Sequence, residues 1–193
     1  MIRDAVLQAA GLLSLELGGP GVYPPQPEGI TEVTFGQPKW EASQGADRYR
    51  RSLYTFRKRT ALFAMYETFD APDGTACVAQ RQVSNTPLQA LTLLNDEMFF
   101  EAAQALGALA AKQPGDERAK AAFALRRVLT REPTDEQIDD VVAFANRQRE
   151  RLIQGELTAE LLTASSAADW IEGAVWTTVA RALFCLDETV TRN

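Results

Sequence analysis

Residues 168–186 read ADWIEGAVWTTVARALFCL, and apolar side chains recur along this stretch at helical spacing on almost every face. Ile171, Val175 and Val179 follow one another at intervals of four, while Trp176 and Phe184 fall on other faces. A helix that is apolar nearly all round is usually buried among other helices. We therefore expect a central helix over about residues 168–186, with the rest of a helical bundle packed around it.

The preceding hundred or so residues contain clear helix starts. Thr86-Pro87-Leu88-Gln89 and Thr134-Asp135-Glu136-Gln137 each place a capping threonine three residues before a glutamine that can reach back to the cap. Asn95 or Asp96 should begin a helix that runs through Leu109. Helices over Asp116–Arg131 and Thr134–Arg151 should form a hairpin joined by Glu132-Pro133.

The N-terminal part has a different character. The spacing of its apolar residues predicts a helix from Ile2 to Leu17, which Gly18-Gly19-Pro20 should end. No capping residue precedes Ile2, so we expect the chain to begin inside a helix of a longer parent protein. Residues 21–46 are rich in Pro and Gly and should form an extended connection, with a possible short strand at Val33–Phe35.

These patterns together predict a mostly α fold: an irregular multi-helix bundle with a long Pro/Gly-rich connection and little or no β structure. We expect one helical domain over residues 1–193. Its parts are a first helix (1–20), the connection (21–46), a polar and aromatic region (47–96) and the helical bundle (97–193).

Composition excludes several classes of protein. The 193 residues carry a net charge of -6 and a pI near 4.8, which argues against binding nucleic acid. Histidine is absent, which removes His-based catalytic triads, His-ligated zinc and axial-His haem. We expect no metal site and no cofactor in the chain, no membrane span and no signal peptide within it. Cys77 and Cys185 could form one disulfide, but buried free thiols are the favoured interpretation.

The segment from Arg48 to Arg59 holds six basic residues and no acidic one, interleaved with aromatic residues. Such a block can bind anionic polymers, including acidic polysaccharide, and Arg50, Arg51, Arg57 and Arg59 are the candidates. The favoured alternative is that its aromatic residues pack inward while the arginines pair with acids of the chain. Because acids are unfavourable at a helix C-terminus, we expect such pairs with Asp187 and Glu188, or with Asp70 and Asp96.

Two further features of this region are ambiguous. Asp70 and Asp73, in Phe69-Asp70-Ala71-Pro72-Asp73-Gly74, are the weak candidates for a catalytic carboxylate pair. Pro-Asp-Gly is also a common turn sequence, and the turn is the favoured interpretation. Ser84-Asn85-Thr86 could hold a ligand at a helix N-terminus, although ordinary capping explains the same residues.

Taken together, residues of the 47–96 region resemble the planctomycete-specific domain one family (PSD1, domain of unknown function DUF1553). The similarity extends to segments near both ends of the chain, including Gly18-Gly19-Pro20 and Leu186-Asp187-Glu188, and indicates the C-terminal part of that domain. The residues that carry it in the central region are Tyr49–Phe56, Lys58-Arg59-Thr60, Phe69–Pro72, Cys77, Arg81, Asn85–Leu91 and Leu94-Asn95-Asp96.

The resemblance implies a setting rather than an activity. Proteins of this family usually join the domain to a companion domain of unknown function and to a cytochrome c domain, which would hold the haem c. They are often exported or periplasmic and are associated with polysaccharide use. Arg57, Gln80 and Glu97 depart from the family pattern, as does Ala61-Leu62-Phe63.

Three functions follow from the sequence. The first is a non-catalytic structural or interaction module that packs against the companion domains of such a parent protein. The second is a polysaccharide-acting enzyme that uses a carboxylate pair, because glycoside hydrolysis needs no histidine. The third is an anionic-glycan-binding module. Arginines buried in internal contacts would favour the first, and arginines exposed together would favour the third.

Overall fold

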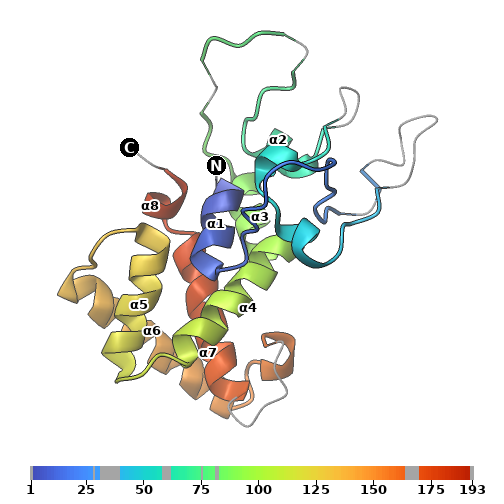
Figure 1. Ribbon diagram of the computed structural model, residues 1–193. Coiled ribbons are helices and arrows are strands. Elements are labelled where there is room, and N and C mark those ends of the chain that lie inside the picture. Colours follow the sequence, from blue (N-terminus) through green and yellow to red (C-terminus); the bar gives the residue numbers. More distant parts are fainter. Residues whose placement is uncertain are drawn as a thin grey trace. The chain divides into compact units, whose positions relative to one another are not determined.

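The computed structural model describes residues 2–27, 29–30, 40–57, 62–74, 76–80, 83–163 and 170–191 (Figure 1). These residues form eight α-helices and three short 3-10 helices, and no β-strand occurs among them. Two isolated parallel bridges join Ser14 to Arg50 and Val22 to Thr55. The expected mostly α fold with little or no β structure is confirmed. The short strand expected at Val33–Phe35 lies outside the described residues.

The contacts divide the chain into two compact units, which we call the helical unit (Met1–Leu12 with Phe99–Asn193) and the irregular unit (Leu13–Met98). The irregular unit is thus an insertion between two parts of the helical unit. The expectation of one domain stays a prediction. The α-helices are α1 (Ile2–Ala10), α2 (Ala64–Thr68), α3 (Pro87–Asn95), α4 (Glu97–Ala111), α5 (Glu117–Leu129), α6 (Asp135–Ile153), α7 (Trp170–Phe184) and α8 (Asp187–Val190).

Helix α7 is the centre of the helical unit. It contacts α5, α6, α8 and the 3-10 helix η3 (Ala159–Leu161). Ala174, Val175 and Trp176 are fully buried on it, and Val179 and Phe184 are 1% exposed. The central helix predicted from residues 168–186 is therefore confirmed, because an all-round apolar surface can only be satisfied by neighbours on several sides.

The predicted helix starts are also confirmed. The Thr134 hydroxyl accepts a hydrogen bond from the Gln137 N–H at 3.2 Å, and the Gln137 side chain accepts one from the Thr134 N–H at 3.0 Å. Thr86 and Gln89 form the same reciprocal pair at the start of α3. The Asp116 carboxylate accepts from the Ala119 N–H at 2.9 Å and caps α5. These contacts depend on residues three apart, so local sequence is enough to specify them.

The expected helix from Ile2 to Leu17 is wrong beyond Ala10. Gly11 adopts a φ of 75°, and the Leu12 N–H returns to the Leu7 carbonyl at 2.9 Å, which ends α1 in a Schellman motif. Arg127 of α5 donates to the carbonyls of Ala9 and Gln8 at this helix end. A cation is favourable at a helix C-terminus, which carries a partial negative charge. The contact therefore both caps α1 and holds it to the rest of the helical unit.

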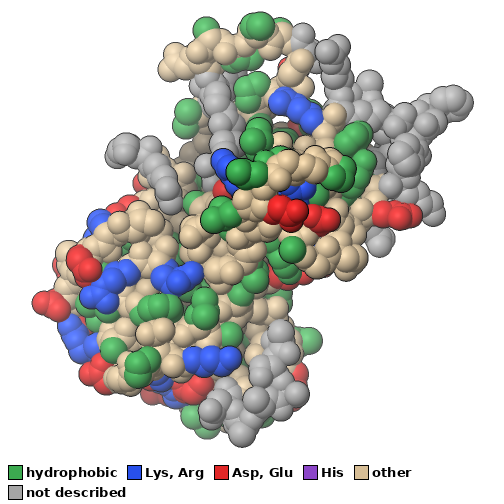
Figure 2. Space-filling view, viewed as in Figure 1, with side chains coloured by type: hydrophobic (Ala, Val, Ile, Leu, Met, Phe, Trp, Pro, Cys, Tyr) green, Lys and Arg blue, Asp and Glu red, His purple; other side chains and the backbone are tan. Residues whose placement is uncertain are grey.

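An ion-pair network joins α5, α6 and α7. The Arg149 guanidinium donates to both carboxylate oxygens of Glu172, at 2.5 and 2.9 Å, and to Glu117 at 3.0 Å. Lys120 also contacts Glu117, at 3.1 Å. Hydrogen bonding from Arg149 lowers the pKa of Glu172, although partial burial opposes that shift. Figure 2 shows side chains of both charges interspersed over the region of α5 and α6, which is typical of local pairing.

Gly107 of α4 marks a close approach to α7. A β-carbon at this position would lie 2.5 Å from the backbone nitrogen of Thr177 and 2.8 Å from its α-carbon. Backbone atoms cannot move aside as a side chain can. We therefore expect Gly107→Ala to lower the free energy of unfolding by about 1–3 kcal/mol, despite the better helix propensity of alanine.

Urea unfolding followed by circular dichroism measures this cost. Gly173→Ala on α7 is the matched control, because its added β-carbon would meet the side chain of Thr163, at 3.1 Å from the hydroxyl and 3.7 Å from the β-carbon, and not backbone. That variant should lose much less stability. Equal stability of Gly107→Ala and the parent chain would show that α4 and α7 do not pack as closely as described.

The Glu172–Arg149 pair predicts a pH dependence. The folded-state pKa of Glu172 lies below its value in the unfolded chain, so its stabilisation is present above about pH 4.5 and is lost as the pH falls through the lowered value. Because Glu172 is partly exposed, we expect Glu172→Gln to cost only roughly 1 kcal/mol at pH 7. Thermal unfolding between pH 3 and pH 7 should show this cost shrinking in acid. Asp140→Asn, which alters an exposed acid of α6, is the control. If the difference in stability between the two variants stayed the same from pH 3 to pH 7, the assignment would be contradicted.

Candidate functional site

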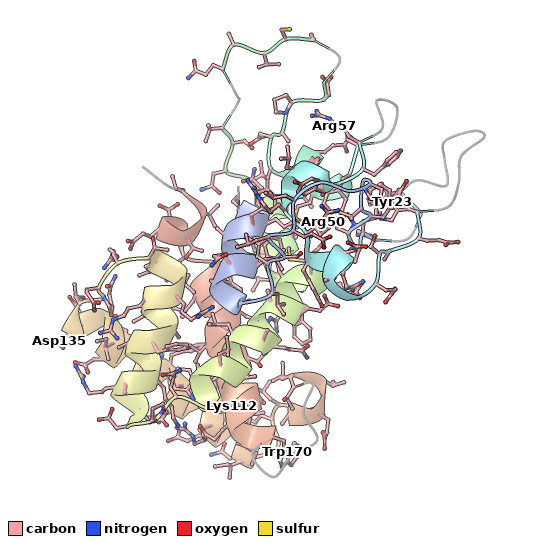
Figure 3. The ribbon with its side chains drawn as sticks, in the orientation of Figure 1. Tyr23, Arg50, Arg57, Lys112, Asp135 and Trp170 are labelled. Carbon is pink, nitrogen blue, oxygen red and sulfur yellow. The ribbon has the colours of Figure 1, made fainter. Side chains whose placement is uncertain are left out.

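The basic block, Arg48 to Arg59, contains a buried arginine in the irregular unit. Arg50 lies between the 3-10 helices η1 (Gly45–Tyr49) and η2 (Ser52–Tyr54) in extended backbone conformation, and it is only 2% exposed (Figure 3). Its guanidinium donates to the backbone carbonyls of Gly18, of Pro20 at 3.3 Å and of Glu16 at 3.4 Å. It therefore binds a loop of its own chain.

Tyr54 and Gly19 complete this site. The Arg50 guanidinium carbon lies 4.0 Å from the centre of the Tyr54 ring, a favourable cation–π distance. The Tyr54 hydroxyl accepts a hydrogen bond from the Gly18 N–H at 3.0 Å. Gly19 has a φ of 84°, and a β-carbon there would lie 3.2 Å from the Arg50 guanidinium. The Gly18-Gly19-Pro20 sequence, expected to end a helix, instead wraps around Arg50.

Arg57 is exposed, in contrast to Arg50, and it is also occupied by its own chain. Its guanidinium donates to the Pro72 carbonyl, and a β-carbon at Gly74 would lie 3.2 Å from it. Arg57 therefore supports the turn that contains Asp73. Arg51 is half-buried, and Arg59 and Arg81 lie outside the described residues.

Asp70 connects the loop after α2 to the start of α3. It adopts a φ of 54°, which is uncommon for a residue with a side chain. One carboxylate oxygen accepts from the Ser84 N–H at 2.9 Å, the Ser84 hydroxyl at 2.6 Å and the Gln89 amide at 3.3 Å. Gln89 also donates to the Thr68 carbonyl at 2.9 Å. These bonds give Asp70 a structural role, and a catalytic role for Asp70 and Asp73 stays a prediction.

Helix α3 buries a glutamine and exposes three leucines. Its buried face carries Gln89, 7% exposed, beside Leu93 at 5%. Its outer face exposes three leucines at intervals of three, which we call the α3 leucine face: Leu88 at 60%, Leu91 at 54% and Leu94 at 38%. A solvated helix normally places leucine inward and glutamine outward. Asn85 lies exposed just before the Thr86 cap.

Glu188 does not meet the basic block as expected. It forms a two-pronged ion pair with Arg131 at 2.5 and 2.6 Å, which lowers the pKa of Glu188. The expectation rested on acids following a helix C-terminus, but Asp187 and Glu188 occupy the first turn of α8, where acids are favourable. Asp187 accepts a hydrogen bond from the Thr191 hydroxyl at 3.1 Å. Within the basic block, Arg48 pairs with Glu97 at 2.6 Å.

The irregular unit contains an aromatic cluster that the sequence did not predict. Tyr23 stacks on Phe56 at 4.9 Å and meets Trp40 edge-on at 5.1 Å, while Trp40 stacks on Phe63 at 5.7 Å. Phe63 also contacts Tyr66 edge-on. These residues come from separate segments with no shared periodicity, so no local pattern could predict the cluster. Of its members, Phe63 is buried, Tyr23, Trp40 and Tyr66 are half-buried, and Phe56 is 37% exposed.

Both cysteines are free thiols. Cys77 is exposed, which corrects the expectation that it is buried. Cys185 is half-buried, and this burial raises the pKa of its thiol. Within the described ranges, no group of three acidic or cysteine side chains could hold a metal ion. No helix among the described residues is long and apolar enough to cross a membrane.

The described residues form a mostly helical fold in which Arg50, Arg57 and Asp70 bind groups of their own chain. The PSD1 family, described as a protein of unknown function (DUF1553), matches residues 1–145, and the chain belongs to this family. The match ends within α6, short of the segment around Leu186 that we also expected to resemble the family. No curated protein and no solved structure matches the chain.

The Arg50 site predicts a loss of stability on a conservative change. Arg50→Lys keeps the charge but cannot bind several carbonyls and cover the Tyr54 ring at once, so we expect a cost of about 1–3 kcal/mol. Limited proteolysis of residues 13–30 and urea unfolding measure this effect. Arg51→Lys is the matched control, since no hydrogen bond joins the Arg51 side chain to the described residues. Equal effects of the two changes would refute a special role for Arg50.

Proposed function

We propose that the chain is a non-catalytic interaction module, which docks through the α3 leucine face onto companion domains of a larger parent protein. The proposal rests on the exposed leucines and the buried glutamine of α3. Leu88, Leu91 and Leu94 lie in water while Gln89 is buried, which is unfavourable unless a partner covers the leucines. Covering them would stabilise the complex by the burial of apolar surface.

The chemistry of α3 indicates what the partner surface must be. No residue from Pro87 to Asn95 carries a charge, so the helix offers no ion pair to a charged partner. A complementary surface would be apolar and uncharged at its centre, as the cores of stable interfaces are. Proteins that this chain resembles join the domain to a companion domain and a cytochrome c domain, which supports such a partner within the parent protein. We place this parent protein in an exported setting tied to polysaccharide use.

The internal use of polar groups supports a module without catalysis. Arg50 binds carbonyls of its own chain, Arg57 binds the Pro72 carbonyl, and Asp70 accepts bonds from Ser84 and Gln89. A binder of anionic glycan needs its arginines exposed together, and an acid/base catalyst needs a carboxylate open to substrate. The contacts of Arg50 and Asp70 favour neither function.

The docking proposal is tested by Leu88→Ser with Leu91→Ser in one chain. Because both side chains are largely exposed, the isolated chain should unfold at an unchanged urea concentration. The remainder of the parent polypeptide is produced as a separate chain, and its affinity for the variant is measured by calorimetry. This affinity should fall by about tenfold or more, as expected for the loss of apolar anchors.

Leu53→Ser is the control, because Leu53 is 75% exposed in the same unit but does not lie on α3. It should leave the affinity unchanged. Unchanged affinity in the double variant would overturn the docking proposal. Binding of the unaltered chain to anionic polysaccharide on a glycan array, lost when Arg51 and Arg57 are both changed to alanine, would contradict it in favour of a glycan-binding module.

A further inference from the structure

The helical unit contains a pocket of about 470 Å³ at the end of α6, far along the chain from the irregular unit. Its size falls in the range of pockets that bind small organic molecules. Six apolar side chains line it: Leu152, Ile153, Leu157, Ala159, Trp170 and Ile171.

The pocket forms because the chain reverses sharply after α6. Gly155 adopts a φ of 74°, and the Glu156 N–H bonds to the Arg151 carbonyl at 3.0 Å, which ends the helix in a Schellman motif. The chain then runs through η3, which contacts α7. The Gln104 amide donates to the Leu162 carbonyl at 3.4 Å and fixes the end of η3 to α4. The walls of the pocket are therefore built on three helices.

Apolar groups of this pocket remain open to solvent. Ile153 is 68% exposed, and Trp170, at the start of α7, is 38% exposed although its ring is the largest apolar group in the lining (Figure 3). An apolar ligand would gain by covering them. A partly exposed indole face also attracts a cation.

Among the described residues that line the pocket, Glu160 is the one that carries a charge. The described residues offer it no ion pair or hydrogen bond. The other acid of this turn, Glu156, is neutralised by Arg151 at 3.0 Å. The described lining thus combines an apolar wall with the negative charge of Glu160, which favours a cation and disfavours an anion.

We propose that this pocket binds a small organic cation with an apolar body, such as a protonated aliphatic amine. The alkyl chain lies along Leu152, Leu157 and Ile171, and the ammonium group lies between the Glu160 carboxylate and the Trp170 ring. A carboxylate ligand of the same length gains the apolar contact but is repelled by Glu160. This site is independent of the α3 leucine face and of the docking function.

Calorimetric titration of the full chain with n-octylammonium and with octanoate, at neutral pH and low salt, tests the site. The two probes share an apolar chain and differ in the sign of the charge. We expect n-octylammonium to bind about tenfold more tightly than octanoate, as a partly screened ion pair and a cation–π contact allow. Glu160→Gln should remove this preference, and Trp170→Ala should weaken the binding of n-octylammonium further.

Glu136→Gln is the matched control, because it removes one exposed acid from the opposite end of α6 and should leave both affinities unchanged. Circular dichroism confirms that each variant is folded. Equal binding of the two probes, no binding of either, or a preference that persists in Glu160→Gln would overturn the proposal.

Discussion

The buried guanidinium of Arg50 is the contact on which the irregular unit depends. A segment without regular helix or sheet must still satisfy its backbone carbonyls, and those of Glu16, Gly18 and Pro20 meet a single side chain. Arginine suits this task because its planar group presents several donors in fixed directions. Tyr54 covers the guanidinium and binds the Gly18 N–H, so one arginine and one tyrosine hold a turn that has no secondary structure of its own.

The helical unit is stabilised in a more familiar way. Its core is the apolar surface of α7, surrounded by α5, α6 and α8, and Arg149 joins the polar sides of these helices through Glu117 and Glu172. Although α1 precedes the irregular unit in sequence, Arg127 caps its end within the helical unit. The irregular unit is thus inserted between α1 and the helices with which α1 packs, which explains why the family signature interrupts the bundle.

Several polar residues of the 69–91 region hold the start of α3, beside its three exposed leucines. Asp70, Ser84 and Gln89 use their hydrogen bonds to fix the start of α3, which turns Gln89 inward and the leucines outward. The same contacts that give Asp70 a structural role therefore create the exposed face. A surface held rigidly in this way loses less entropy on association than a mobile one.

The sequence alone determined the helical class, the central position of α7 and the starts of α3, α5 and α6. These features depend on apolar periodicity and on capping contacts between residues three apart, both of which are local. The end of α1 was also encoded locally, by Gly11, but the apolar spacing that continues to Leu17 concealed it. Only the tertiary structure decided that Arg50 is buried, that Glu188 pairs with Arg131 and that α3 faces inward with Gln89. Each of these features depends on contacts between segments that are distant in sequence. The type of a residue does not specify which group its charge or amide will pair with or hydrogen-bond to.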